Sequence, residues 1–217
     1  MASKTFSTFA RASALMVSLL FADAALAQQV VRTVPGGARP ASARAAFRIK
    51  DISKPGKSSL VSSPDIDGKV KSPGHISRGQ GWKWSMLEVK YETAPEWIDE
   101  ATFTFYVLCQ DSKTKEYHLF QTAVSYLDIA KGDHVAAAML PPNAVVRYGE
   151  PISFGVEVAI DGEKVAESAA GAGGPDWWTK GLEKIPEARL KRHSGYLKDR
   201  SQTPFGVTHI DEYEAVR

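Results

Sequence analysis

Residues 152–162, ISFGVEVAIDG, decide the fold because apolar side chains alternate with small or polar ones. A period of two residues is typical of a β-strand with one buried face. The closing Asp161-Gly162 pair is typical of a two-residue hairpin turn, because glycine adopts a positive φ at little cost. Residues 163–169 then form the returning strand. The stretch therefore predicts an antiparallel hairpin and indicates a mainly β protein.

Strand-like patterns also precede this hairpin. Residues 45–52 alternate, and residues 101–110 place Phe103, Phe105, Val107 and Cys109 on one face. Residues 117–127 are apolar on both faces, which is typical of a central strand. Residues 134–140 are Ala-rich, and the pattern leaves a strand or a helical turn open.

The segment GWKWSMLEVKYET, residues 81–93, contains a change of phase. Trp82, Trp84 and Met86 share one face, and the apolar positions then shift by one residue at Leu87. Because side chains in a strand have a period of two, this slip predicts a β-bulge. Pro95-Glu96-Trp97 is predicted to end the strand.

Together these segments predict an antiparallel, immunoglobulin-like β-sandwich of about seven strands, with an irregular C-terminal tail packed on it. We expect residues 53–81, rich in Ser, Pro, Gly and Lys, to form a long loop. We expect one short helix over residues 187–193.

The N-terminal segment has the features of a secretory signal. Residues 1–27 contain Lys4 and Arg11, a short apolar stretch, and the small-residue triplet Ala25-Leu26-Ala27. Cleavage after Ala27 predicts a protein exported to the periplasm, the outer membrane surface or the extracellular space, with no transmembrane anchor after cleavage. The predicted organisation is a signal peptide (1–27), a flexible basic linker (28–44), the sandwich (45–169) and a docked C-terminal extension (170–217).

Composition limits the function further. The chain has 217 residues, 43% hydrophobic and 24% charged, with a net charge of +2, which is too small to indicate nucleic acid as a partner. The single Cys109 excludes an intramolecular disulfide and a cysteine-based zinc cage. The five histidines lack metalloprotease spacing. We therefore predict no metal ligands and no cofactor.

No catalytic residue is predicted. The chain has no Gly-x-Ser-x-Gly turn for a serine nucleophile. Glu96, Asp99 and Glu100 lie beside Trp97, and paired carboxylates near an aromatic ring suit a glycosidase. A secreted hydrolase is therefore kept as the second alternative.

Trp177 and Trp178 are the candidate binding residues. Adjacent residues of an extended chain point in opposite directions, so both rings can anchor the tail, or one can form an exposed platform for a sugar or a partner protein. The second arrangement would suit a carbohydrate-binding β-sandwich, which is the first alternative function.

The C-terminal motifs resemble a known family. GPDWWTK at 174–180 and SGYLKDRSQTPFGVTHIDEYEAVR at 194–217, with Gly81-Trp82-Lys83-Trp84 and residues 103–108, are similar to secreted pilus-like proteins of Verrucomicrobia such as Akkermansia. The resemblance implies an immunoglobulin-like fold, a role in a cell-envelope assembly and no known catalysis. The leader resembles a general secretory signal and not a prepilin leader.

These observations predict a non-enzymatic, secreted cell-envelope protein. It would be a pilus-like accessory or surface component that acts through protein–protein interaction. Its expected partners are envelope or pilus-like assembly proteins, with a glycan as the alternative ligand.

Overall fold

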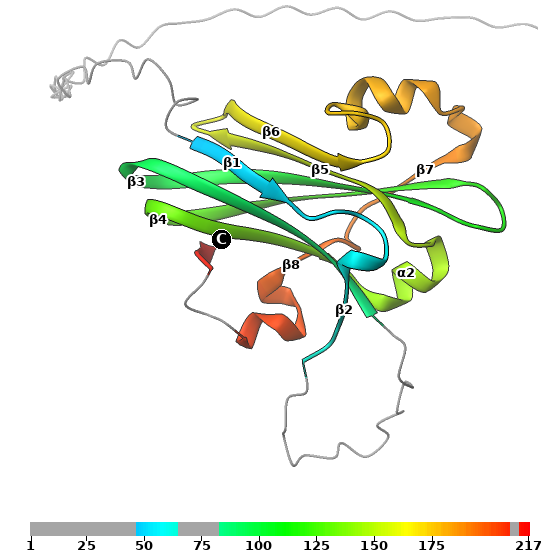
Figure 1. Cartoon of the computed structure of the whole chain (residues 1–217), viewed down its shortest axis with the longest axis horizontal. Helices are drawn as coiled ribbons and strands as arrows, with labels where there is room; N and C mark the ends of the chain where they lie inside the picture. Colours follow the sequence, from blue (N-terminus) through cyan, green and yellow to red (C-terminus); the bar gives the residue numbers. More distant parts are fainter. Residues whose placement is uncertain (1–46, 65–82, 209–212) are drawn as a thin grey trace, which may run out of the picture. The chain divides into compact units, whose positions relative to one another are not determined.

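The architecture rests on two very long central strands (Figure 1). The computed structural model describes residues 47–64, 83–208 and 213–217. The expected signal peptide and linker lie outside the described residues. Strand β3 spans Lys83–Gln110 and strand β4 spans Tyr117–Leu140. They pair antiparallel from Ser85 opposite Leu140 to Gln110 opposite Tyr117, so one hairpin forms the centre of the sheet.

Shorter strands add to both sides of this hairpin in the order β6-β5-β3-β4-β7. Strands β1 and β2 also pair with β3, whereas β8 and β9 pair with β4. Only the β4–β7 pairing is parallel among the described strands. The shorter strands are β1 (Phe47–Ile52), β2 (Leu60–Ser62), β5 (Pro151–Ile160), β6 (Glu163–Gly171), β7 (Leu190–His193), β8 (Lys198–Asp199) and β9 (Ala215–Val216).

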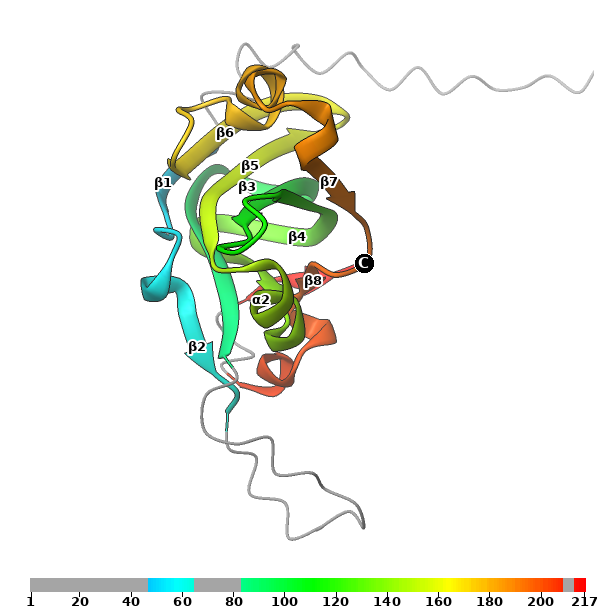
Figure 2. The same cartoon turned by 90° about the vertical axis from the view of Figure 1, so that its right-hand side faces the viewer.

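Short helical segments connect the strands. Helix α2 spans Pro142–Tyr148 and follows β4 directly. The other segments are single turns: η1 (Lys57–Ser59), η2 (Trp177–Gly181), η3 (Leu182–Lys184), η4 (Glu187–Arg189), η5 (Arg200–Gln202) and η6 (Pro204–Val207). In Figure 2, β1 and β2 lie along one side of β3, and β7 lies on the side of β4.

The mainly β prediction is confirmed, but its details need correction. The described strands form one nine-stranded mixed sheet, so the number of strands and the parallel β4–β7 pair differ from the prediction of about seven antiparallel strands, and the immunoglobulin-like detail is not confirmed. The prediction that Pro95-Glu96-Trp97 ends a strand is wrong. Thr93 pairs with Gly132 and Trp97 with Ala130, so three residues of β3 lie opposite one residue of β4. A bulge accommodates the proline, which has no N–H for the ladder, and the strand continues.

The bulge predicted at Met86 is absent, because the β3–β4 register is continuous from Ser85 to Thr93. Leu87, Val89 and Tyr91 form the buried face there. Trp84 lies on the opposite, half-buried face, where its ring meets that of Phe205 edge-on at 6.1 Å. The change of phase in the sequence therefore marks a strand with apolar residues on both faces.

Other local predictions have mixed outcomes. The Asp161-Gly162 turn is confirmed, with φ values of 53° and 76° at the two residues. Residues 134–140 are the end of β4 and thus a strand. The loop predicted over 53–81 contains η1 and β2 in its described part. The helix expected over 187–193 is only the turn η4, followed by β7.

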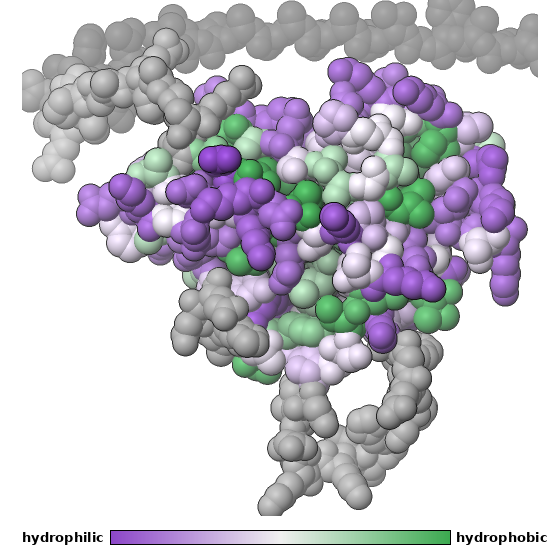
Figure 3. Space-filling model, in the orientation of Figure 1, coloured by the Kyte–Doolittle hydropathy of each residue, from purple (hydrophilic) through white to green (hydrophobic). Residues whose placement is uncertain are grey.

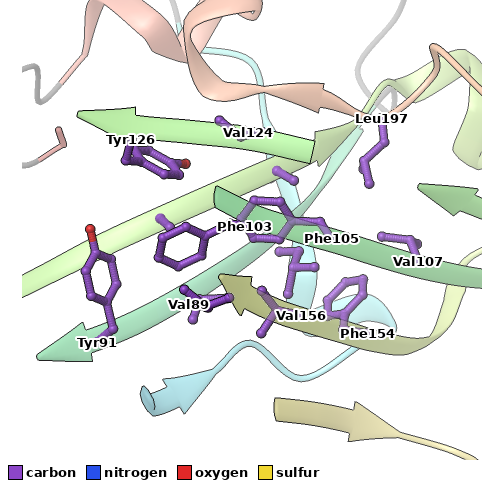
Figure 4. Packing of buried hydrophobic residues seen from close by; sticks show 14 of the residues in the cluster. Val89, Tyr91, Phe103, Phe105, Val107, Val124, Tyr126, Phe154, Val156 and Leu197 are labelled. Atoms are coloured by element: carbon purple, nitrogen blue, oxygen red, sulfur yellow. The ribbon is translucent and has the colours of Figure 1, made fainter. Parts of the chain in front are cut away.

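Aromatic rings fill the core on the buried face of β3 (Figure 4). Phe103 lies at its centre, 5.1 Å from Tyr91, 5.1 Å from Tyr126 and 5.8 Å from Phe47, measured between ring centroids. The predicted face with Phe103, Phe105, Val107 and Cys109 is confirmed, because all four are fully buried. Such contacts between aromatic rings add to the free energy gained from burying apolar surface.

Cys109 is expected to be a structural, unreactive thiol. Its side chain is fully buried, and burial raises the pKa of the thiol because the thiolate loses its hydration. Native protein should therefore react slowly with a thiol reagent, and unfolded protein quickly. Cys109→Ala should lower the free energy of unfolding by about 1–2 kcal/mol through lost packing. Rapid labelling of the native protein would contradict this assignment.

Candidate functional site

The adjacent tryptophans dock the C-terminal extension on the sheet. Trp177 is 2% exposed, and its Nε1–H donates a hydrogen bond of 2.9 Å to the carbonyl oxygen of Phe154 in β5. Trp178 is 5% exposed and stacks on Tyr106 with the ring planes 9° apart and the centroids 5.3 Å apart. This burial contradicts the alternative in which one ring is an exposed platform, and both rings act as anchors.

Gly155 makes this docking possible. A Cβ atom at Gly155 would lie 2.4 Å from Cε3 of Trp178, well inside van der Waals contact. The absence of a side chain in β5 therefore lets the indole lie directly on the backbone. The Nε1–H of Trp178 is buried and has no acceptor among the described residues.

A groove of about 920 Å³ lies between the docked turns and strand β7. Leu182, Ile185 and Leu190 supply its apolar surface and pack on the same cluster as the two tryptophans. Its lining residues are Trp178, Thr179, Leu182, Glu183, Ile185, Pro186, Glu187, Leu190, Lys191, Arg192 and His193. All four residues of β7 line this groove, which is the candidate functional site.

Strand β7 is an open edge of the sheet. It pairs in parallel with β4, from Tyr117 opposite Leu190 to Phe120 opposite His193. Among the described residues, no strand or loop makes backbone hydrogen bonds to its other side. In a strand paired on one side only, a row of N–H and C=O groups remains available for a further strand. The sequence of residues 187–193 predicted a helix, so this strand edge was not expected.

His193 of β7 lies against His118 of the neighbouring strand β4. Nδ1 of His118 is 3.0 Å from Nε2 of His193, and the rings of Phe120, Tyr148 and Tyr196 surround the pair. Burial lowers the pKa of both histidines. For His118, the charges of Glu116 and Asp111 oppose this shift, and those of Lys191 and Arg147 add to it. Only one of the two facing nitrogens can carry a proton, because two N–H groups would collide.

Acidification is expected to destabilise the protein through this pair. A histidine whose pKa is lowered in the folded state binds fewer protons than in the unfolded state, so stability is complete above pH 6.5 and falls as pH drops below it. The urea midpoint should therefore decrease from pH 7 to pH 5. His193→Gln should reduce this pH dependence, and an unchanged dependence in that variant would contradict the assignment.

The chain's C-terminal residues dock on the other half of β4. Strand β9 pairs with β4 at Tyr126 and Leu127. Oε1 of Glu214 is 2.6 Å from Nδ1 of His134, whose Nε2 lies 2.8 Å from the carbonyl oxygen of Ala130. Both ring nitrogens thus face acceptors, so the pair ties the chain end to the sheet.

The acidic residues kept for the hydrolase alternative lie at the β3 bulge. Trp97 is 61% exposed there, and Glu96 and Asp99 are exposed beside it. Glu100 forms an ion pair of 3.0 Å with Arg217. A glycosidase holds its paired carboxylates in an enclosed cleft, whereas these carboxylates lie at the surface. In Figure 3, hydrophilic residues prevail at the left-hand end of the molecule, where Figure 1 shows β3 and β4 bending.

The described part of the chain contains neither a cluster of metal-binding side chains nor a helix that could span a membrane. In the ranges 47–64, 83–208 and 213–217, no three His, Cys, Asp or Glu side chains gather closely enough to hold a metal ion. In the same ranges, no helix has the length and apolar run needed to cross a bilayer.

The fold and groove define a mainly β protein with a docked C-terminal extension, and the comparisons place it in a family. A family model matches residues 50–217, so the chain belongs to this family, which is the verrucomicrobial, Akkermansia-type family that its motifs resemble. The chain is similar to a crystal structure of a protein from Akkermansia muciniphila, with a TM-score of 0.60 and 22% identity. That match covers 79% of this chain and 92% of the other. No curated protein matches the chain.

Proposed function

We propose that the protein is a non-enzymatic, exported component of the cell envelope that acts by binding another protein. In this role it is an accessory or surface component of a pilus-like assembly. Membership of the Akkermansia-type family and the secretory pattern of residues 1–27 support export and an envelope role.

The observation that carries the proposal is the groove beside the open edge of β7. An apolar floor next to unpaired backbone groups suits a polypeptide chain, because strand addition supplies main-chain hydrogen bonds and the floor receives side chains. Lys191 and Arg192 lie on an exposed strand, where they can contact a partner.

The carbohydrate-binding alternative has weaker support. It requires an exposed aromatic platform, whereas Trp177 and Trp178 are buried. Trp97 is the one exposed tryptophan among the described residues, and a single exposed ring does not form a coplanar pair.

A pull-down from envelope fractions with the exported chain as bait tests the proposal. We expect the native bait to retain a defined protein that heat-denatured bait does not retain. A matched bait with Trp97→Ala should retain the same protein, because that ring lies away from the groove. Retention of a polysaccharide without protein, lost with Trp97→Ala, would support the carbohydrate alternative and contradict the proposal.

A further inference from the structure

The chemistry of the groove specifies its occupant more closely. The segment 180–193, which forms most of the groove, contains five basic and two acidic residues. Lys191 and Arg192 are exposed on β7 itself, whereas Glu183 and Glu187 are exposed on the turns η3 and η4. The edge that would pair with an incoming strand is therefore positively charged.

The exposed side chains of this edge are also hydrogen-bond donors. Lys191 and Arg192 carry only donors. A segment that brings carboxylate oxygens would pair with these two side chains.

A second copy of the same edge does not fit. Antiparallel pairing of β7 with β7 about a two-fold axis pairs a residue with its own copy, so it would place Lys191 opposite Lys191, or Arg192 opposite Arg192, of the other copy. Like charges directly opposite each other destabilise a strand pair. Basic residues on an edge strand also prevent indiscriminate pairing. The same charges favour a strand of opposite sign.

Basic residues alone would only prevent the edge from pairing with other strands. The apolar floor beside this edge indicates that it also binds a segment. Leu182 is 6% exposed, and Ile185 and Leu190 are half-buried on the same cluster. Side chains of an added strand alternate between the two faces, so one set would rest on this floor while the other faces solvent. Recognition would thus combine main-chain pairing, apolar contact and charge.

We propose that the open edge of β7 binds an acidic, extended segment of a partner protein by strand addition in this groove. The inference rests on the proposed function as a protein-binding component and names the chemistry of its partner. Residues 190–193 provide the pairing edge, Leu182, Ile185 and Leu190 the floor, and Lys191 and Arg192 the charge.

Two synthetic peptides test the inference with the purified exported chain. One has the sequence TVEVDVT and the other TVKVKVT, both with blocked ends, so that they share β-propensity and differ in charge. We expect the acidic peptide to bind at least tenfold more tightly at low salt, with an affinity that falls as salt screens the charges. It should slow amide hydrogen exchange at residues 190–193.

Charge-reversal variants provide the matched controls. The double variant Lys191→Glu with Arg192→Glu should reverse the preference and bind the basic peptide. Lys113→Glu with Lys164→Glu changes the net charge equally at exposed positions outside the groove and should keep the original preference. Circular dichroism of each variant confirms that it is folded.

The inference is overturned if neither peptide binds, if both bind equally, or if residues 190–193 show no protection. Peptide failure with a protein still retained in the pull-down would overturn strand addition and leave the proposed function standing. Loss of the pull-down partner would instead overturn the function itself.

Discussion

Replacing Trp177 by alanine is expected to lower the free energy of unfolding by about 3–5 kcal/mol, the range for a buried tryptophan. The indole is 2% exposed, and its Nε1–H satisfies the carbonyl of Phe154 in the middle of the sheet. The substitution therefore leaves a cavity and removes the hydrogen bond that ties the extension to the sheet. Urea unfolding of the two proteins measures the difference.

Trp97→Ala is the matched control for this experiment. Trp97 is 61% exposed, so the same change of residue should alter the free energy of unfolding by no more than about 0.5 kcal/mol. Similar losses for the two variants would contradict the assignment of Trp177 as the anchor of the extension.

Ending the chain at Gly171 is expected to abolish cooperative folding. The shortened chain would lack the two tryptophans, Leu182, Leu197 and strands β7, β8 and β9. It would also uncover Leu108, Leu119 and one side of β4. Domains are stabilised by only about 5–15 kcal/mol, and removal of several buried side chains exceeds that margin.

Circular dichroism during heating and light scattering check this expectation. The shortened chain should show no sharp thermal unfolding transition. It should also aggregate, because apolar side chains and the unpaired edge of β4 become exposed together. A soluble shortened chain with the transition of the whole protein would show that residues 172–217 are an appendage.

The sequence was sufficient where one face of a strand is buried and the other is not. Residues 151–171 form the predicted hairpin because alternation and the Asp161-Gly162 turn specify the same structure. The face with Phe103 and Cys109 was predicted for the same reason. Local pattern and burial coincide at these positions.

The sequence was insufficient where distant segments supply the environment. Trp84 and Met86 suggested a bulge because the segment that covers them, around Phe205, is more than a hundred residues away. The groove depends on β7 pairing with β4 in parallel, which residues 187–193 alone do not encode. The burial of Trp178 depends on Gly155, whose importance appears only once the two are in contact.

The central claim is that the protein binds its partner at the groove beside β7. A photo-cross-linking amino acid placed at Arg192, within the groove, tests this claim in cells, and the same amino acid at Lys164, on the exposed strand β6, is the control. The account predicts one defined protein adduct from position 192, reduced by the acidic peptide TVEVDVT, and none of that protein from position 164. Equal adducts from both positions, or adducts from position 164 alone, would contradict it.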